Sequence, residues 1–172
     1  LAVGSVWGSN SAQDAWGLGT VSLYSFDDLA FSNPVLEATI GSGYTGGKNV
    51  DLSILERPDF FGSAVSLDGT RLVVGAQLDE GFNNIYSGGT DEHSGPGAVY
   101  LFTFSDLEFN GTTHVGTIGE GYIGPNDLDL ASTLDGWDYF GESVSLDGNI
   151  LAVGSPGVGD NFFTGGVYLF SF

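Results

Sequence analysis

The sequence predicts an all-β fold made of β-propeller blades of four antiparallel strands, about two and a half blades in all. The first observation behind this prediction is an internal repeat: residues 59–76 return 79 positions later as residues 138–155, with eleven of 18 positions identical. The second is an Asp-Gly pair between two β-rich runs in both copies, and the third is a later run that is apolar on nearly every position. Such a period indicates units that stack on their neighbours, because one unit alone cannot bury its apolar face.

The first two strands of a blade are predicted to form a hairpin around the Asp-Gly pair. Short runs rich in aliphatic residues flank Asp68-Gly69 at 65–67 and 72–74, and flank Asp147-Gly148 at 144–146 and 149–153. Asp-Gly between two such runs is a strong hairpin signal, and it predicts a type I′ turn with Asp and Gly at its centre.

The third strand of a blade is predicted at residues 98–104 and 167–172. Both runs lack polar alternation, which in a strand indicates that both faces are covered. We therefore expect Val99, Leu101, Val167 and Leu169 to be buried along with the aromatic residues between them. A weaker fourth strand is predicted over residues 35–40 and 113–118.

Both ends of the chain fall inside a copy of the repeat. The first five residues match 151–155, and the last residues match 97–104. The prediction is a partial blade with its connecting loop (1–58), a complete blade with its loop (59–137) and a partial blade (138–172). The opening blade is expected to lack its first strand and the closing blade its fourth, as in part of a larger propeller or assembly from a longer secreted chain.

Composition excludes several classes of function. The net charge is −19, with 22 acidic residues against three Lys and Arg, so binding to nucleic acid is not expected. No stretch of 18 apolar residues occurs, so membrane insertion is not expected either. The acidic surface suits surroundings where cations screen its repulsion, so we expect an extracellular or cell-surface protein; cysteine is absent and gives no evidence on the redox compartment.

The repeated residues also resemble a known family. The pattern is Phe-Gly, then an aliphatic hairpin ending in Gly-Ala or Gly-Ser-Pro, then Gly-Ala-Val-Tyr-Leu-Phe or a close variant. This pattern resembles the bacterial variant of the FG-GAP repeat found in integrin-α-like propellers. The matching segments are Phe61-Gly62, 72–76, 97–102, Phe140-Gly141, 151–157 and 165–170. The resemblance implies a propeller fold, and it implies much less about function, because propellers carry many activities.

The resemblance also implies a calcium loop between the first two strands, which this chain lacks. The family's Asp-x-Asp-x-Asp-Gly loop is reduced here to Leu67-Asp68-Gly69-Thr70 and to 146–149. One carboxylate on a short turn cannot supply the six to eight oxygens that calcium requires. Asp68 and Asp147 are therefore interpreted as turn formers.

Calcium remains the candidate ligand of a second motif, and no other cofactor is predicted. Asn49 and Asp51 recur 78 residues later as Asp127 and Asp129. Alternate residues of an extended segment point the same way, so each pair could bind an ion together with nearby carbonyls. The favoured alternative is that these side chains cap or pin the loop.

The longest loop, residues 77–97, is the predicted place for binding, because long loops on a repeat scaffold carry repeat-specific contacts. Its polar candidates are Asp79, Glu80, Asn83, Asn84, Asp91 and Glu92, and a solvated loop is the alternative. Asn110-Gly111-Thr112 is a glycosylation sequon, so Asn110 is a candidate acceptor in a suitable host.

No catalytic constellation is found in the sequence. It contains no G-x-S-x-G, no H-E-x-x-H and no cysteine nucleophile. Three functions remain: a structural or assembly protein that associates with itself or with further repeats, an adhesion module that binds an extracellular protein or glycan, and a glycan-active enzyme. The first is favoured and the third is the least favoured.

Overall fold

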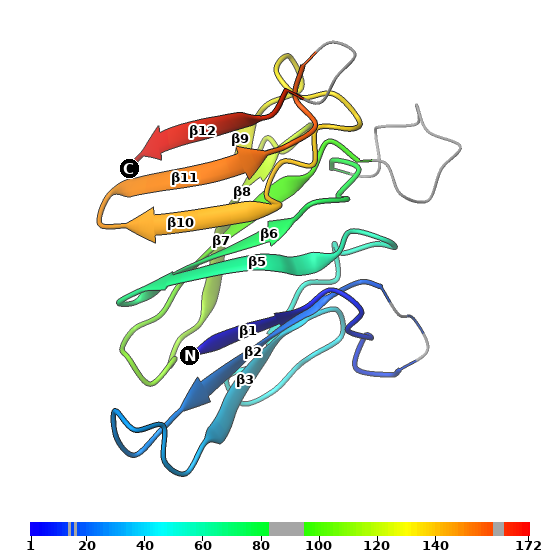
Figure 1. Ribbon diagram of the computed structural model, residues 1–172. Helices are drawn as coiled ribbons and strands as arrows, with labels where there is room; N and C mark the ends of the chain where they lie inside the picture. The colour runs from blue at the N-terminus through cyan, green and yellow to red at the C-terminus, as the bar shows by residue number, and fades with distance from the viewer. Residues whose placement is uncertain (14, 16, 83–94, 160–163) are drawn as a thin grey trace.

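Three β-sheets, antiparallel except for one short strand pair in each of the first two, make up the computed structural model, which describes residues 1–172 except 14, 16, 83–94 and 160–163. The sheets lie one above another, with the N-terminal sheet at the bottom and the C-terminal sheet at the top (Figure 1). Blade 1 holds β1 (Ala2–Ser5), β2 (Thr20–Ser25), β3 (Val35–Gly41) and β4 (Val50–Asp51). Blade 2 holds β5 (Phe61–Asp68), β6 (Arg71–Ala76), β7 (Ala98–Thr103), β8 (Thr113–Gly119) and β9 (Leu128–Asp129). Blade 3 holds β10 (Ser143–Asp147), β11 (Ile150–Ser155) and β12 (Gly166–Ser171).

The predicted fold class is confirmed. The strands of each sheet are hydrogen-bonded in chain order, and the described residues contain no helix. Blade 2 carries all four predicted strands, blade 1 starts at the second strand, and blade 3 ends at the third. Within the part of the chain that the structure describes, no helix has the length and apolar character needed to cross a membrane.

The hairpin turns differ from the prediction by one residue. Asp68 pairs with Arg71, and Asp147 pairs with Ile150, so both aspartates end a strand and the two-residue loops are Gly69-Thr70 and 148–149. Glycine at the first loop position has φ +57° in one turn and +52° in the other, while the residue after it has no positive φ. This is the type II′ pattern and not type I′. Asp68 and Asp147 are therefore not central turn residues.

Each of the first two blades ends in a short strand that the sequence did not predict. β4 pairs with β3 and β9 pairs with β8, both in parallel and over two residues. The loop after the fourth strand thus folds back along that strand, which places Asp51 and Asp129 beside the sheet edge.

The core lies between the blades. One buried cluster joins β2 and β3 to β6 and β7, and a second joins β6, β7 and β8 to blade 3. On β7 the prediction of two covered faces is right, since Val99, Tyr100 and Phe102 are buried and Leu101 is half-buried. On β12 it is wrong: Val167 is 70% exposed and Leu169 is 73% exposed, because no described segment covers that face.

A single backbone hydrogen bond closes the loop after the second strand in all three blades. The N–H of Gly19 donates to Gly8 O, that of Gly97 to Asp79 O, and that of Gly165 to Val158 O, at 3.0–3.1 Å. These bonds enclose residues 9–18, 80–96 and 159–164. We call them the loop clamps.

Candidate functional site

Neighbouring blades meet through a corner of backbone that we call the Phe-Gly corner, Phe61-Gly62 in blade 2 and Phe140-Gly141 at the start of blade 3. The N–H of Phe61 donates to Leu18 O at 3.2 Å, and that of Phe140 to Pro96 O at 2.9 Å. Both corners therefore dock onto the preceding blade in the same way.

Glycine pairs on the preceding blade make room for each corner. A Cβ on Gly4 or Gly19 of blade 1 would overlap the carbonyl oxygen of Gly62 or Phe61. In blade 2 the matching residues are Gly75 and Gly97, whose added Cβ atoms would overlap carbonyl oxygens of Gly141 and Phe140. The overlapping atoms belong to the backbone and cannot move aside, so a residue with a side chain would displace the corner. We call these four residues the seat glycines.

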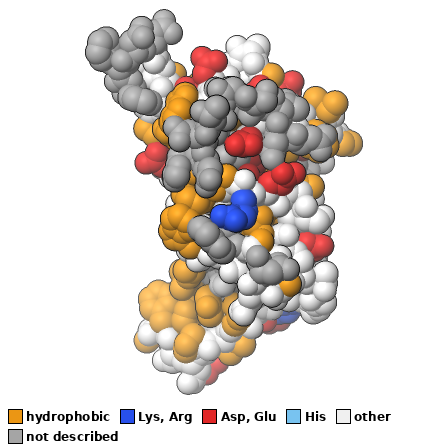
Figure 2. Space-filling model, turned by 90° about the vertical axis from the view of Figure 1, so that its right-hand side faces the viewer, with side chains coloured by type: hydrophobic (Ala, Val, Ile, Leu, Met, Phe, Trp, Pro, Cys, Tyr) orange, Lys and Arg blue, Asp and Glu red, His pale blue; other side chains and the backbone are white. Residues whose placement is uncertain are grey.

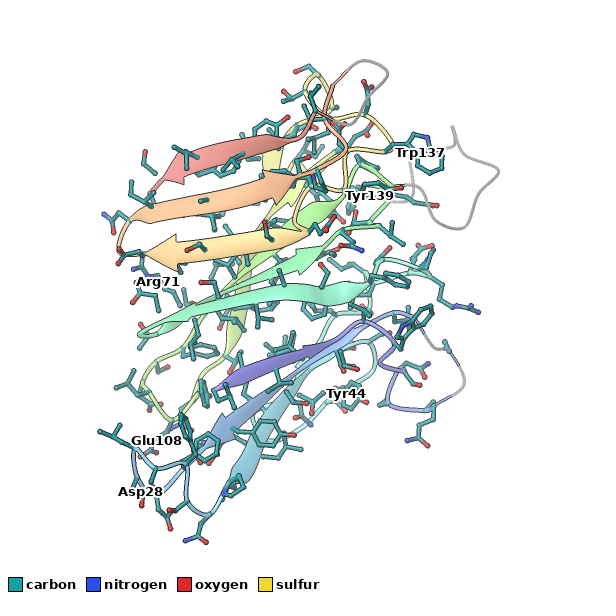
Figure 3. The ribbon with its side chains drawn as sticks, viewed as in Figure 1. Asp28, Tyr44, Arg71, Glu108, Trp137 and Tyr139 are labelled. Carbon is teal, nitrogen blue, oxygen red and sulfur yellow. The ribbon has the colours of Figure 1, made fainter. Side chains whose placement is uncertain are left out.

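Side-chain acceptors on β5 bind the first hairpin of blade 3. Ser66 Oγ accepts the N–H of Leu146 at 2.9 Å, and Asp68 Oδ2 accepts the N–H of Gly148 at 2.9 Å. Arg71, which lies at the end of the molecule where β10 and β11 turn (Figure 3), also donates to Asp68 Oδ2 at 3.1 Å. Asp68 thus joins two blades, a role that its interpretation as a turn former missed.

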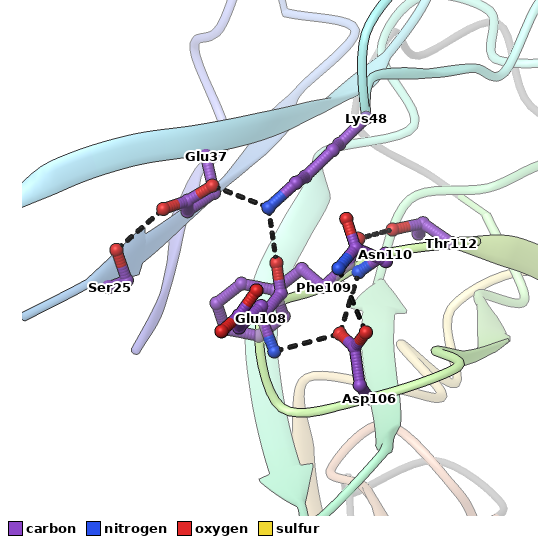
Figure 4. Close-up of polar contacts among 8 residues, drawn as sticks. All are labelled: Ser25, Glu37, Lys48, Asp106, Glu108, Phe109, Asn110 and Thr112. Atoms are coloured by element: carbon purple, nitrogen blue, oxygen red, sulfur yellow. Dashed lines mark hydrogen bonds and ion pairs between the residues drawn. The ribbon is translucent and has the colours of Figure 1, made fainter.

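Lys48 joins blades 1 and 2 at their other edge (Figure 4). Its ammonium donates to Glu37 Oε2 at 2.7 Å and to the carbonyl of Glu108 at 2.6 Å. The Glu108 turn is itself held by Asp106, whose Oδ1 accepts the N–H of Glu108 at 2.9 Å. In blade 2 the equivalents of Lys48 and Glu37 are Asn126 and Val115. This contact is therefore specific to the pair of blades 1 and 2.

The terminal blades each leave an apolar face open. Equivalent residues of the first and last of the third strands show it best: Val21 and Leu23 of β2 are 0% exposed beneath blade 2, whereas Val167 and Leu169 of β12 lie in solvent. At the opposite end Leu1 is 51% exposed and Val3 is 44% exposed, although their equivalents on β6 and β11 are buried. The equivalent buried residues are Leu72, Val74, Leu151 and Val153.

A buried cluster of two carboxylates and two tyrosines includes Asp79, at the start of the longest loop. Asp79 Oδ2 accepts hydrogen bonds from the hydroxyls of Tyr100 at 2.6 Å and Tyr122 at 2.9 Å, and Asp79 Oδ1 accepts the N–H of Gly81 at 2.8 Å. Asp59, 4% exposed, accepts the N–H of Glu56 at 2.7 Å.

Burial governs the ionisation of this cluster. Desolvation, and next the neighbouring Asp79 charge, hold the pKa of Asp59 well above its usual range. Desolvation also raises the pKa of Asp79, against the opposing effect of its tyrosine and backbone donors. Since Asp79 has three donors, we assign the negative charge to Asp79 and the proton to Asp59.

The structure places the candidate metal ligands in loop-pinning hydrogen bonds. Asn49 Oδ1 and Asp127 Oδ1 accept the N–H of the strand residues Thr39 and Thr117, both at 2.8 Å. Asp51 Oδ1 accepts the N–H of Gly43 at 2.7 Å, and Asp129 Oδ1 accepts those of Gly121 and Ala131. The N–H groups of Ala131 and Gly121 lower the pKa of Asp129. No group of three or more His, Cys, Asp or Glu that could hold a metal occurs in the described ranges, and calcium binding stays a prediction.

Removal of calcium with EDTA is expected to leave the melting temperature nearly unchanged. The carboxylates of Asp51 and Asp129 already accept backbone N–H groups that pin their loops. A ligand at a hundred times its dissociation constant would add about 2.7 kcal/mol to stability, so its loss is easily seen by calorimetry. A fall of several degrees on chelation, reversed by added calcium, would contradict this expectation.

Only some of the predicted binding-loop residues lie in the part of the chain that the structure describes. Asp79 is buried and Glu80 is half-buried at the start of the long loop, while Asn83, Asn84, Asp91 and Glu92 lie outside the described residues. Asn110 lies in the turn before β8, where its side-chain amide donates to Asp106 Oδ2 at 2.8 Å. Asp28, in the equivalent turn of blade 1, lies at the same end of the molecule as Glu108 (Figure 3).

Sequence reasoning missed the residues that join the blades. Ser66, Lys48 and the seat glycines were not singled out, because each looks ordinary in a single copy of the repeat. The signal that could have found the glycines is their recurrence: Gly4, Gly75 and Gly154 occupy one position of the repeat, and Gly19, Gly97 and Gly165 occupy another.

Three sheets of the same strand order, joined by the same backbone corner, define a repeat protein of the β-propeller type. Comparison with known families gives a match to the FG-GAP repeat over residues 56–102 and 130–170. The chain belongs to the FG-GAP repeat family, and the resemblance seen in its sequence is confirmed. No curated protein matches the chain.

Proposed function

We propose that this chain is a non-enzymatic extracellular structural protein that assembles with further repeats of its own kind through the edges and faces of its blades. The carrying observation is the contrast at two repeat positions: Val21 and Leu23 are fully buried, whereas Val167 and Leu169 are 70% and 73% exposed. Full burial of such a side chain contributes roughly 1.5–3 kcal/mol. Covering these two exposed side chains with another blade would therefore stabilise an assembly.

The sheet edges support the same proposal. In blade 2 the second strand pairs with β5 and the third with β8, whereas β1 and β12 are the last strands of their sheets. Free N–H and C=O groups on an edge strand recruit further strands. Edge pairing and face packing together would extend the stack at both ends.

Surface charge supports an extracellular setting. The net charge is −19, and acidic side chains outnumber basic ones on the face seen in Figure 2. FG-GAP repeats are typical of extracellular or surface-associated proteins. Self-repulsion of such a surface is weakened by salt and divalent cations, which favours assembly in those surroundings.

The isolated chain is expected to associate in a concentration-dependent manner, as measured by light scattering after size-exclusion chromatography. Changing both Val167 and Leu169 to Asp should shift the equilibrium toward the monomer. Association would then bury two negatively charged carboxylates in the contact, which costs free energy. Leu29→Asp is the matched control, since Leu29 is 100% exposed on a turn outside this face. A monodisperse monomer that melts cooperatively at all concentrations would rule out the proposal.

A further inference from the structure

An open groove of about 540 Å³ lies on the outer face of blade 3. It is lined by Glu142, Ser143, Gly154, Ser155, Pro156, Gly165, Gly166 and Val167. Gly154 and Gly165 are the repeat equivalents of the seat glycines Gly75 and Gly97. The nearest atoms to a Cβ on Gly154 would all belong to Ser143 of the same blade, with the side-chain hydroxyl the nearest, and one on Gly165 would come no closer than 3.7 Å to Pro156.

The same place in the other two blades is filled. Phe61-Gly62 occupies it on blade 1, and Phe140-Gly141 occupies it on blade 2. The backbone acceptors of the corner are Leu18 O and Pro96 O, and their equivalent on blade 3 is the carbonyl of Thr164. The groove therefore has the shape and the backbone acceptor of a Phe-Gly seat.

The surface beside the groove also carries the equivalents of the side-chain acceptors that bind the following hairpin. Ser145 and Asp147 are the equivalents of Ser66 and Asp68, which accept two N–H groups from the following hairpin. Both Ser145 and Asp147 are exposed, and the open face continues through Ile150 and Leu169, 51% and 73% exposed. Ser145, Ile150 and Leu169 lie on one face, since Ser145 and Leu169 both pair with Ala152.

We infer that this groove is a docking site for the Phe-Gly corner of a further blade of the same repeat, an inference that rests on the proposed function. The occupant is an aromatic residue followed by glycine, with a Leu-Asp-Gly turn five residues beyond that glycine, as in Phe61-Gly62 and Leu67-Asp68-Gly69. Continuity with the two interfaces inside the chain identifies this occupant. A second copy of the described chain does not supply it, because both of its corners are already seated on its own blades.

The test is one glycine substitution made in two chains. The first chain is the 172-residue protein, and the second is lengthened after Phe172 by another copy of residues 105–172, which supplies a fourth strand and a further corner. Gly154→Ala should shift the melting temperature by less than about 2 °C in the first chain and lower it by about 5–10 °C in the second. Gly75→Ala is the positive control, since its Cβ would overlap Gly141 O in both chains.

The outcomes separate this inference from the proposed function. Equal, small effects of Gly154→Ala in the two chains would overturn the inference, and so would an added segment that stays unfolded and leaves the melting temperature of the lengthened chain unchanged. If the 172-residue chain still associates through Val167 and Leu169 in either case, the proposed function stands without the groove. If the 172-residue chain does not associate, but Gly154→Ala still lowers the melting temperature of the lengthened chain, the proposed function fails and the inference about the groove stands.

Discussion

Gly97→Ala is expected to lower the free energy of unfolding by about 2–5 kcal/mol. Gly97 has φ +86°, where an L-residue costs about 1–2 kcal/mol. Its Cβ would also overlap the carbonyl oxygen of Phe140, and overpacking of this kind costs about 1–3 kcal/mol more. Urea unfolding followed by tyrosine and tryptophan fluorescence measures the change.

Gly165→Ala is the control that separates the two causes. Gly165 is the equivalent residue of blade 3 and has φ +72°, so it carries the same backbone cost. The nearest atom outside its chain neighbours to an added Cβ is 3.7 Å away. We expect a loss of about 1–2 kcal/mol. Equal losses at the two sites would mean that the Phe-Gly corner does not press on Gly97.

Stability is expected to fall as the pH rises above the ordinary range of aspartate ionisation, near 3.9. Burial and the Asp79 charge raise the pKa of Asp59 in the folded state, so the folded state holds its proton more tightly than the unfolded state. The stability from this proton is fully present below the unfolded pKa and is lost as the pH rises through the folded pKa. Each such proton gives a slope of about 1.4 kcal/mol per pH unit.

Hydrogen-bonded carboxylates outside the core act in the opposite direction at lower pH. Hydrogen bonds lower the pKa of Asp28, Asp106 and Asp129, so their contribution is present above the unfolded pKa and is lost as the pH falls through the folded pKa. The melting temperature should therefore peak at about pH 4, where the two effects meet.

Asp59→Asn isolates the buried pair. The amide oxygen of Asn can still accept the N–H of Glu56, but the side chain no longer ionises, so we expect higher stability at neutral pH and a flatter pH profile. Asp138→Asn is the matched control: Asp138 accepts the N–H of Asp135 in the same way, and its raised pKa involves no second buried carboxylate. An unchanged profile in Asp59→Asn would contradict the assignment of the proton to Asp59.

Local patterns explain what could be predicted from the sequence. The Asp-Gly pairs located both hairpins because glycine must sit in the loop, but they did not show that Gly69-Thr70 is the loop and that Asp68 ends β5. Strands β4 and β9 have two residues each, which is too short for any periodicity to appear.

Long-range contacts explain what could not be predicted. The partners of Asp79 are Tyr100 and Tyr122, 21 and 43 residues away, so a residue expected in a polar loop is fully buried. The prediction of two covered faces on β12 is wrong, because the composition of a strand does not tell which segments lie against it, and no described segment covers that face. Val167 and Leu169 are exposed for that reason.

The loop clamps allow the loop after the second strand to change in length without a change in the strands on either side of it. Each clamp ties the two ends of the loop by one backbone hydrogen bond, whether residues 9–18, 80–96 or 159–164 lie between them. Because loop-closure entropy grows only slowly with length, lengthening a closed loop costs about 0.6 kcal/mol for each doubling. The positions between Asp79 and Gly97 are therefore suited to the insertion of foreign peptides, and each of the other two clamps lies at the same strand ends of its own blade, between the second and third strands.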